Sequence, residues 1–228
     1  MDSALIVKGF EIAGAIIYMM ALVVSLKTRN PFYLGLFVSC NLMVFWDWIF
    51  NLKWFFNVTF HEEATVLWKM AGERETLTAA LAFVSFYYWV FHLLVRYRDT
   101  LDDVMGRWQY PLIYVASALY VLAFEILFVN LGVWEYHQKE RFELYGVAYS
   151  NAWLNAHMIL GGYLLLRYSM RWARIPDAAI GFDPRTETFW KSSVLALSAP
   201  ITGIFLAFAL QMIWYINTQP WVESPRLF

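Results

Sequence analysis

The sequence predicts an all-α fold: a polytopic transmembrane bundle of about six helices, with both termini on the outer side of the membrane. Composition, the length of the apolar runs and the distribution of basic residues all point to it. Of the 228 residues, 61% are hydrophobic and only 15% are charged, whereas soluble domains have about 45–50% apolar and about 25% charged residues. A soluble domain of this length could not bury so much apolar surface, because a large share of any globule faces water.

Six apolar runs predict the helices, since each is near the ~20 residues that a helix needs to cross the hydrocarbon core. In chain order they are 4–26, 31–56, 77–95, 110–134, 147–168 and 189–216. Lys8 and Glu11 interrupt the first run, so we interpret it as a retained helix and not as a secretory signal. Ala199, Gly203 and Ala207 form a stripe of small residues on the last run, which predicts close helix packing. No repeat divides the chain, and we expect a single membrane domain over residues 1–228.

Basic residues predict the orientation. The connections after the first, third and fifth runs are rich in bases: Lys27, Arg29, Arg96, Arg98, Arg107, Arg171, Arg174 and Arg185. The connections after the second and fourth runs hold fewer bases, mixed with acids. Because basic connections stay on the inner side, both termini are expected outside. We interpret the acidic stretch 61–75 as a solvated outer segment that could form a short helix over the mouth of a cavity.

Charge and cysteine content exclude several classes of function. The net charge is −1 and no Lys/Arg block is present, which argues against a nucleic-acid partner. A single cysteine, Cys40, excludes an internal disulfide framework and a multi-cysteine metal site. The four histidines fall on separate segments without metal-ligand spacing. We therefore predict neither a metal nor another cofactor.

Two acids inside the runs are the candidate catalytic residues. Ionisable groups within a membrane are costly and are functional candidates by default. Asp47 lies near the middle of the second run, and Glu125 lies deep in the fourth, with no Lys or Arg within helical reach. A carboxyl buried without a cation stays protonated, which is the state a general acid requires. The alternative is an interhelical hydrogen bond that fixes packing. Glu11 is three residues from Lys8, which favours a local ion pair.

Polar residues at helical spacing accompany both acids. Asn51 is one turn from Asp47, and Asn151 and Asn155 are one turn apart on the fifth run. Residues four apart share a helix face, so we expect these amides to orient an acid or a substrate. His92 on the third run is a further candidate for substrate binding. The alternative, interhelical hydrogen bonding, is the commoner role of any single Asn.

The aromatic content is the second informative feature. The chain has 12 Trp, 14 Tyr and 19 Phe. Some, such as Trp134 and Tyr136, belong to predicted interfacial belts, where Trp and Tyr anchor helices. Others, such as Trp46, Tyr88 and Trp153, lie inside runs. Ring faces stabilise cations, and a protonated alkene is a cation. A buried proton donor among such rings suits protonation of an isoprenoid double bond, while generic bulky packing is the alternative.

Two sets of motifs resemble known families. Glu125, the stretch Asn130-Leu131-Gly132-Val133-Trp134-Glu135-Tyr136, the stretch Leu144-Tyr145-Gly146-Val147 and Asn151-Ala152-Trp153 together resemble the bacterioruberin-type carotenoid hydratases. Separately, Ser25-Leu26-Lys27-Thr28-Arg29, Ser39-Cys40-Asn41 and Trp46-Asp47 look like the first third of the small membrane terpene cyclases of fungal meroterpenoid and indole-diterpene pathways. In those cyclases the acid after Trp is a proposed proton donor. The last run here carries no acid where the cyclases have their second carboxylate. Both resemblances imply acid-initiated addition across an isoprenoid alkene.

The sequence therefore favours an integral membrane isoprenoid cyclase or hydratase, with Asp47 or Glu125 as the proton donor. The expected substrate is a hydrophobic isoprenoid or lipid-like molecule. The residues expected to contact it are Asn51, Asn151, Asn155, Trp46, Trp153, Tyr88 and His92. Two alternatives stay open: a proton- or cation-coupled transporter that uses the same acids, and a non-catalytic assembly subunit.

Overall fold

The structure is a computed structural model, and it describes residues 3–45, 58–70, 73–137, 143–144, 147–175 and 180–218. This part of the chain is mostly helical. Its α-helices are α1 (Ser3–Lys27), α2 (Pro31–Leu42), α4 (Leu77–Phe83), α5 (Trp89–Arg96), α6 (Arg98–Met105), α7 (Gln109–Asn130), α8 (Tyr149–Ala173) and α9 (Glu187–Thr218). A π-helical turn, η1 (Val84–Tyr88), joins α4 to α5, and a short 3-10 turn, η2 (Gly106–Trp108), joins α6 to α7.

Within these described ranges, four helical segments are long and apolar enough to cross a membrane. They are Ala4–Lys27, Leu77–Arg96, Arg98–Asn130 and Glu187–Leu210. Large apolar side chains on α1 and α7, such as Ile12 and Leu119, are exposed on the surface of the bundle, as expected of helices that face lipid. The predicted helical bundle is therefore confirmed in its class. The part of the second run from residue 46 onward, which includes Trp46, Asp47 and Asn51, lies outside the described residues.

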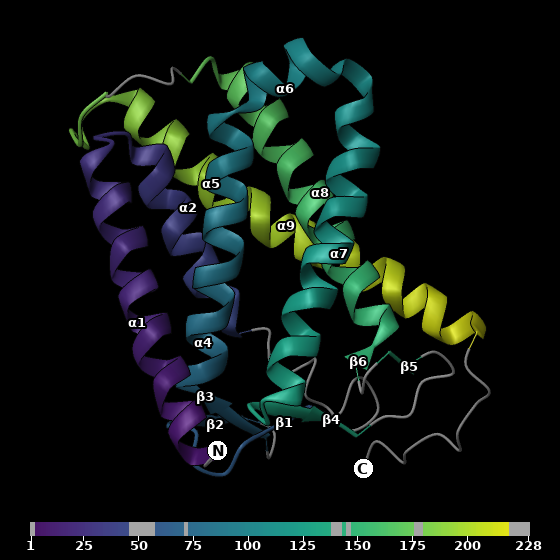
Figure 1. The fold of residues 1–228 in the computed structure, drawn as a ribbon. Coiled ribbons are helices and arrows are strands. Elements are labelled where there is room, and N and C mark those ends of the chain that lie inside the picture. Colours follow the sequence, from purple (N-terminus) through teal and green to yellow (C-terminus); the bar gives the residue numbers. More distant parts are fainter. Residues whose placement is uncertain are drawn as a thin grey trace.

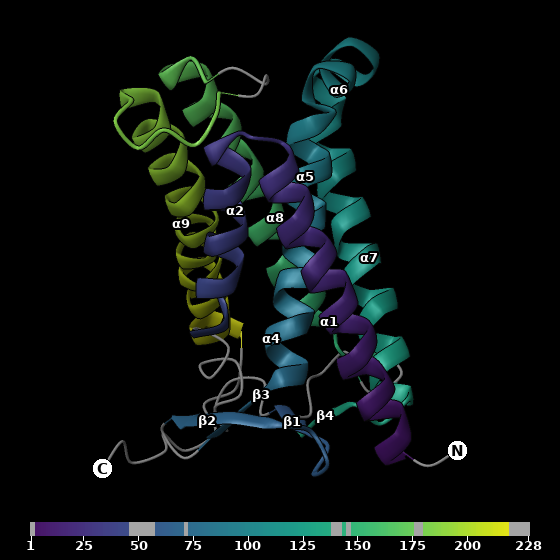
Figure 2. The same cartoon turned by 90° about the vertical axis from the view of Figure 1, so that its left-hand side faces the viewer.

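Most of the helices run alongside one another, whereas α9 crosses them obliquely (Figure 1); the short strands gather at one end of the bundle and α6 lies at the other (Figures 1 and 2). The strands are β1 (Val58–Phe60), β2 (Val66–Met70), β3 (Glu73–Thr76), β4 (Trp134–Tyr136), β5 (Glu143–Leu144) and β6 (Val147–Ala148). In the part of the chain that the structure describes, they form three antiparallel pairs: β1 with β4, β2 with β3, and β5 with β6. The acidic stretch is thus mainly a β-hairpin, and the short helix expected there is wrong.

Small residues let the last helix cross its neighbours at close range. A Cβ atom on Gly203 of α9 would lie 2.8 Å from the backbone nitrogen of Gly162 on α8. A Cβ on Gly35 of α2 would lie 2.6 Å from the carbonyl oxygen of Ser193 on α9. Such spacing leaves no room for a side chain, so the backbones of α9, α8 and α2 pack directly. Ala199 is also buried, which agrees with the predicted stripe.

Helix α7 ends at Asn130, although its apolar run continues to Trp134. Gly132 has a φ of 72°, a left-handed conformation that glycine adopts without strain. The Gly132 and Val133 amides donate back to the Val129 and Phe128 carbonyls over 3.0 Å, as in a glycine-terminated helix. The chain leaves the helix axis here, so Trp134 begins strand β4 and is not helical.

Strand β4 pairs with β1 in the register Val58↔Tyr136, Thr59↔Glu135 and Phe60↔Trp134. We call these two strands the cap. Thr59 and Glu135 are exposed, while the alternate residues are buried or half-buried beneath them, as the two-residue period of a strand requires. The cap therefore joins two connections that are distant in sequence and turns one aromatic-rich face toward the helices.

Glu11 anchors α1 to the connection that follows the cap strand β1. Its carboxylate accepts hydrogen bonds from the Thr65 amide over 2.7 Å and from the Thr65 hydroxyl over 2.9 Å. Lys8 Nζ lies 3.1 Å from Oε2 of Glu11, which confirms the local ion pair expected from sequence. The group is structural, because a buried carboxylate with these partners is already satisfied.

The opposite end of the bundle holds a second polar network. Arg167 on α8 is buried and forms an ion pair with Asp102 on α6. Its Nη1 donates to Oε1 of Gln109 over 3.0 Å, and Nε2 of Gln109 donates to Oδ1 of Asp102 over 2.7 Å. A buried guanidinium is tolerated only when it is paired and hydrogen-bonded. This network therefore fastens the α6–α7 junction to α8.

Candidate active site

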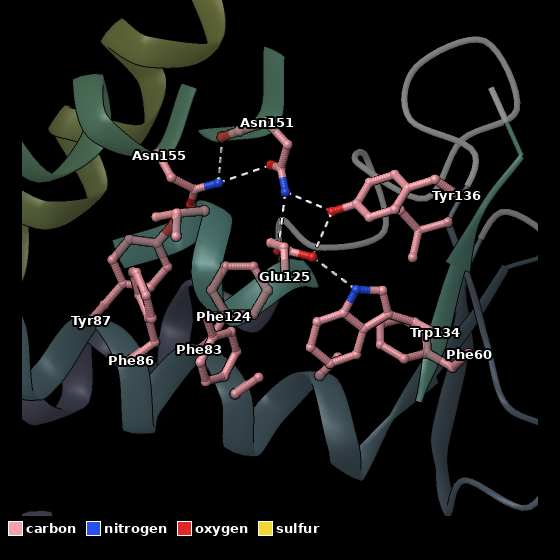
Figure 3. A pocket seen from close by; sticks show the side chains of 14 residues that line it. Phe60, Phe83, Phe86, Tyr87, Phe124, Glu125, Trp134, Tyr136, Asn151 and Asn155 are labelled. Atoms are coloured by element: carbon pink, nitrogen blue, oxygen red, sulfur yellow. Dashed lines mark hydrogen bonds between the residues drawn. The ribbon is translucent and has the colours of Figure 1, made fainter. Parts of the chain in front are cut away.

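A cavity of about 110 Å³ lies between α4, η1, α7, α8 and the cap (Figure 3). Its wall is largely aromatic and aliphatic, and its polar groups cluster on one side. The lining residues are Val58, Phe60, Ala79, Ala82, Phe83, Phe86, Tyr87, Val121, Phe124, Glu125, Trp134, Tyr136, Asn151 and Asn155. The predicted acid Glu125 and both predicted amides of the fifth run, Asn151 and Asn155, are thus brought to one cavity.

Three side chains form hydrogen bonds to the Glu125 carboxyl. Nε1 of Trp134 donates to Oε2 over 2.8 Å, and the Tyr136 hydroxyl donates to the same oxygen over 2.9 Å. Nδ2 of Asn151 donates to Oε1 over 3.0 Å. The carboxyl is therefore held from the cap on one side and from α8 on the other, with both oxygens engaged (Figure 3).

A row of side chains fixes the orientation of the Asn151 amide. Nδ2 of Asn155 donates to Oδ1 of Asn151 over 2.8 Å and to the Asn151 backbone carbonyl over 2.8 Å. The Tyr87 hydroxyl donates in turn to Oδ1 of Asn155. Each amide oxygen is occupied, so each amide nitrogen points onward toward Glu125. The expectation that Asn151 and Asn155 share one helix face agrees with this row.

The π-helical turn η1 explains how the third helix serves this site. A π turn inserts one extra residue into a helix and is often found at functional sites. Phe86 and Tyr87 of η1 line the cavity, whereas Tyr88 points toward α1, where its hydroxyl lies 2.6 Å from Oγ of Ser25. The widened turn thus presents consecutive aromatic residues to two different neighbours.

The electrostatics of the cavity centre on a single carboxyl. Among the lining residues that the structure describes, Glu125 is the one carboxylic acid, and no Lys, Arg or His accompanies it. Its three partners are neutral donors. A carboxylate formed here is stabilised by fixed dipoles and not by a counter-ion.

Glu125 does not lie deep in its helix as the sequence suggested. It precedes the last residue of α7, Asn130, by five positions, which is roughly 8 Å at 1.5 Å per residue. The carboxyl therefore sits directly beneath the cap. The sequence placed Glu125 further from the helix end because the apolar run continues past the true end of α7.

Other predicted site residues lie elsewhere. Trp153 stacks on Tyr114 of α7 with ring centroids 5.4 Å apart. His92 packs against the Tyr33 ring at a centroid distance of 4.9 Å, near Tyr88. Trp153, Tyr88 and His92 are not among the residues that line the cavity, and their substrate-binding role stays a prediction. Asp47, Asn51 and Trp46 lie outside the described residues, so their roles stay predictions as well.

Sequence reasoning did not assign a role at the site to Trp134 or Tyr136. Trp134 was expected to anchor a helix end at the interface, and Tyr136 belongs to the same predicted belt. The glycine turn and the resemblance of 130–136 to a family motif were signals of a special segment, but neither indicated hydrogen bonds to Glu125.

Within the described residues, no group of three or more His, Cys, Asp or Glu could hold a metal ion.

Comparisons with protein-family models, curated proteins and solved structures find no match for this chain. The class follows from the fold and the site alone. The described part of the chain is a helical protein with four segments long and apolar enough to cross a membrane, and it holds a hydrogen-bonded carboxyl in an aromatic cavity beneath the cap.

Proposed function

We propose that this protein is a multi-pass membrane enzyme that protonates an isoprenoid alkene, as a hydratase or cyclase does, with Glu125 as the acid. The observation that carries the proposal is the placement of the Glu125 carboxyl in an aromatic cavity, with three neutral donors directed at its oxygens. The positive-inside pattern supports an orientation with the cap and both termini outside.

The donors suit the chemistry of proton transfer. When the O–H bond of Glu125 breaks and a C–H bond forms on the alkene, a carboxylate and a carbocation result. The N–H groups of Trp134 and Asn151 are already oriented toward the carboxylate, and the Tyr136 hydroxyl oxygen lies within hydrogen-bond distance of it, so little reorganisation is needed. Hydrogen bonds to a charged oxygen contribute about 1.5–3 kcal/mol each.

The aromatic wall suits the other half of the ion pair. Phe83, Phe86 and Phe124 line the cavity with Glu125, and ring faces stabilise a nearby cation by about 0.5–2 kcal/mol each. The cation is then quenched when water or a substrate hydroxyl adds to it, or when a neighbouring C–H bond gives up its proton. In each case the released proton returns to the Glu125 carboxylate, and the acid is regenerated.

The size of the cavity favours reaction at one double bond over the folding of a long polyene. A dry apolar cavity of about 150 Å³ holds one benzene molecule. The cavity here is about 110 Å³, so it has room for about one isoprene unit. Addition of water at a single alkene therefore fits better than a multi-ring cyclisation within this space.

The test is turnover in membranes supplied with isoprenoid polyenes. Glu125→Gln keeps the shape of the side chain but removes the acid, and we expect product formation to fall to background. Glu135→Gln is the matched control, because Glu135 lies on the exposed face of the same cap strand. Full turnover in Glu125→Gln would refute the proposal. Proton-dependent flux by a wild-type protein that shows no turnover would favour the transporter alternative.

A further inference from the structure

The proposed cycle requires the Glu125 carboxyl to keep its hydrogen-bond partners in two states, as a protonated acid and as a carboxylate. Two of its partners serve as donors in both states. Nε1 of Trp134 and Nδ2 of Asn151 bear hydrogens and no acceptor lone pair, so each can only donate. Asn151 cannot turn its oxygen toward Glu125 without losing the bond from Nδ2 of Asn155 to that oxygen, which is 2.8 Å long.

The third partner is chemically different. A tyrosine hydroxyl has one rotatable hydrogen and two acceptor lone pairs. The Tyr136 oxygen accepts a hydrogen from Nδ2 of Asn151 over 2.6 Å and lies 2.9 Å from Oε2 of Glu125. A hydroxyl that accepts from Asn151 can therefore still act toward Glu125 either as a donor or as an acceptor.

We infer that Tyr136 is a positioning residue that exchanges its hydrogen-bond role with the state of Glu125. In the acid state the Tyr136 oxygen accepts the O–H of Glu125. After the proton has passed to the substrate, the Tyr136 hydroxyl rotates and donates to Oε2. The inference rests on the proposed function, because the exchange matters only if Glu125 cycles between the two states.

The cap is therefore part of the proton-handling machinery as well as a cover. Tyr136 reaches the carboxyl because Gly132 ends α7 and the β1–β4 pairing holds strand β4 in place. A purely structural tyrosine would hold the cap in position but would not sense the proton on Glu125. Infrared spectroscopy separates these roles, because the carbonyl band of a carboxylic acid depends on the hydrogen bonds made by its O–H and C=O groups.

The experiment uses the full chain in lipid nanodiscs without substrate. The carboxylic-acid band of Glu125 is assigned by its loss in Glu125→Gln. We expect this band to shift in Tyr136→Phe, which removes only the hydroxyl, and to stay in place in Tyr120→Phe. Tyr120 stacks on Phe86 of the same cavity wall with ring centroids 4.7 Å apart. Incorporation of 3-fluorotyrosine at position 136 retains the hydroxyl and alters its acidity, so it should shift the band even if Tyr136→Phe folds poorly.

An unshifted band in both Tyr136 variants would overturn the inference and leave the proposed function standing. The absence of any acid band from Glu125 in the wild type would overturn both, because no acid state would exist. A shifted band in a protein that turns over no isoprenoid would support the inference and count against the proposed function alone.

Discussion

The indole nitrogen of Trp134 donates to Oε2 of Glu125 over 2.8 Å and so joins cap strand β4 to helix α7 at the carboxyl. The two residues are only nine positions apart, yet they belong to different elements because Gly132 turns the chain between them. The relationship makes the cap and the candidate acid parts of one site.

Trp134→Phe should lower turnover while leaving the aromatic wall largely filled. The variant loses one of three donors to the carboxylate, worth about 1.5–3 kcal/mol, which corresponds to about a tenfold to hundredfold loss of rate. Initial rates on the best isoprenoid substrate measure it. Trp172→Phe is the control, since Trp172 on α8 is exposed; equal losses in both variants would contradict a specific role for the indole.

The register of the cap can be tested with a disulfide. Thr59 and Glu135 are opposed on its exposed face, and directly opposed strand residues have Cα separations that a disulfide can span. Thr59→Cys combined with Glu135→Cys should therefore cross-link on mild oxidation and raise the melting temperature. Native Cys40 is buried and should not compete.

Non-reducing electrophoresis after proteolysis between the two positions reports the bond. The matched control is Thr59→Cys alone, with its register partner Glu135 left intact, so that no second cysteine lies on the exposed face of the cap. Failure of the double variant to cross-link would show that β1 and β4 are not paired in this register.

Arg167→Met should destabilise the bundle by about 1.5–3 kcal/mol, because it removes the hydrogen bonds of the buried guanidinium to Asp102 and Gln109. Thermal unfolding in detergent measures the effect without a substrate. Arg171→Met is the control: Arg171 lies 3.7 Å from the same carboxylate, but its side chain is 73% exposed. Exposed pairs contribute about 0–1 kcal/mol, so a similar loss in both variants would contradict a buried anchor.

Gly203→Ala should destabilise the packing of α9 on α8, since its Cβ would lie 2.8 Å from the Gly162 nitrogen. We expect a loss of about 1–3 kcal/mol from overpacking. Gly9→Ala on α1 is the matched control, because its Cβ would meet nothing within 4 Å. The control should be neutral or stabilising by up to about 1 kcal/mol through helix propensity; the opposite order of stabilities would argue against this helix crossing.

The helices could be predicted because their signal is local. The apolar run of α1 is long enough to span lipid, and its bounds in the structure differ from the prediction by one residue at each end. The end of α7 was missed because Trp134 is as apolar as the helix before it. There the conformation of Gly132 overrides hydropathy.

The site could be predicted only in part, for a related reason. Asn151 and Asn155 are one turn apart on a single helix, so their shared face follows from spacing. Trp134 and Tyr136 reach Glu125 only because β4 pairs with β1, which is some 75 residues away. No local pattern specifies that pairing, so the two cap residues were assigned to an interfacial belt and not to the carboxyl.

The most direct test of the central claim is deuterium transfer. Membranes containing the protein are incubated in D₂O with an isoprenoid substrate, and the product is analysed by mass spectrometry and NMR. If Glu125 protonates the alkene, the product carries one carbon-bound deuterium on the protonated carbon, and Glu125→Gln forms no such product. A product without carbon-bound deuterium, or equal labelling in Glu125→Gln, would contradict the account.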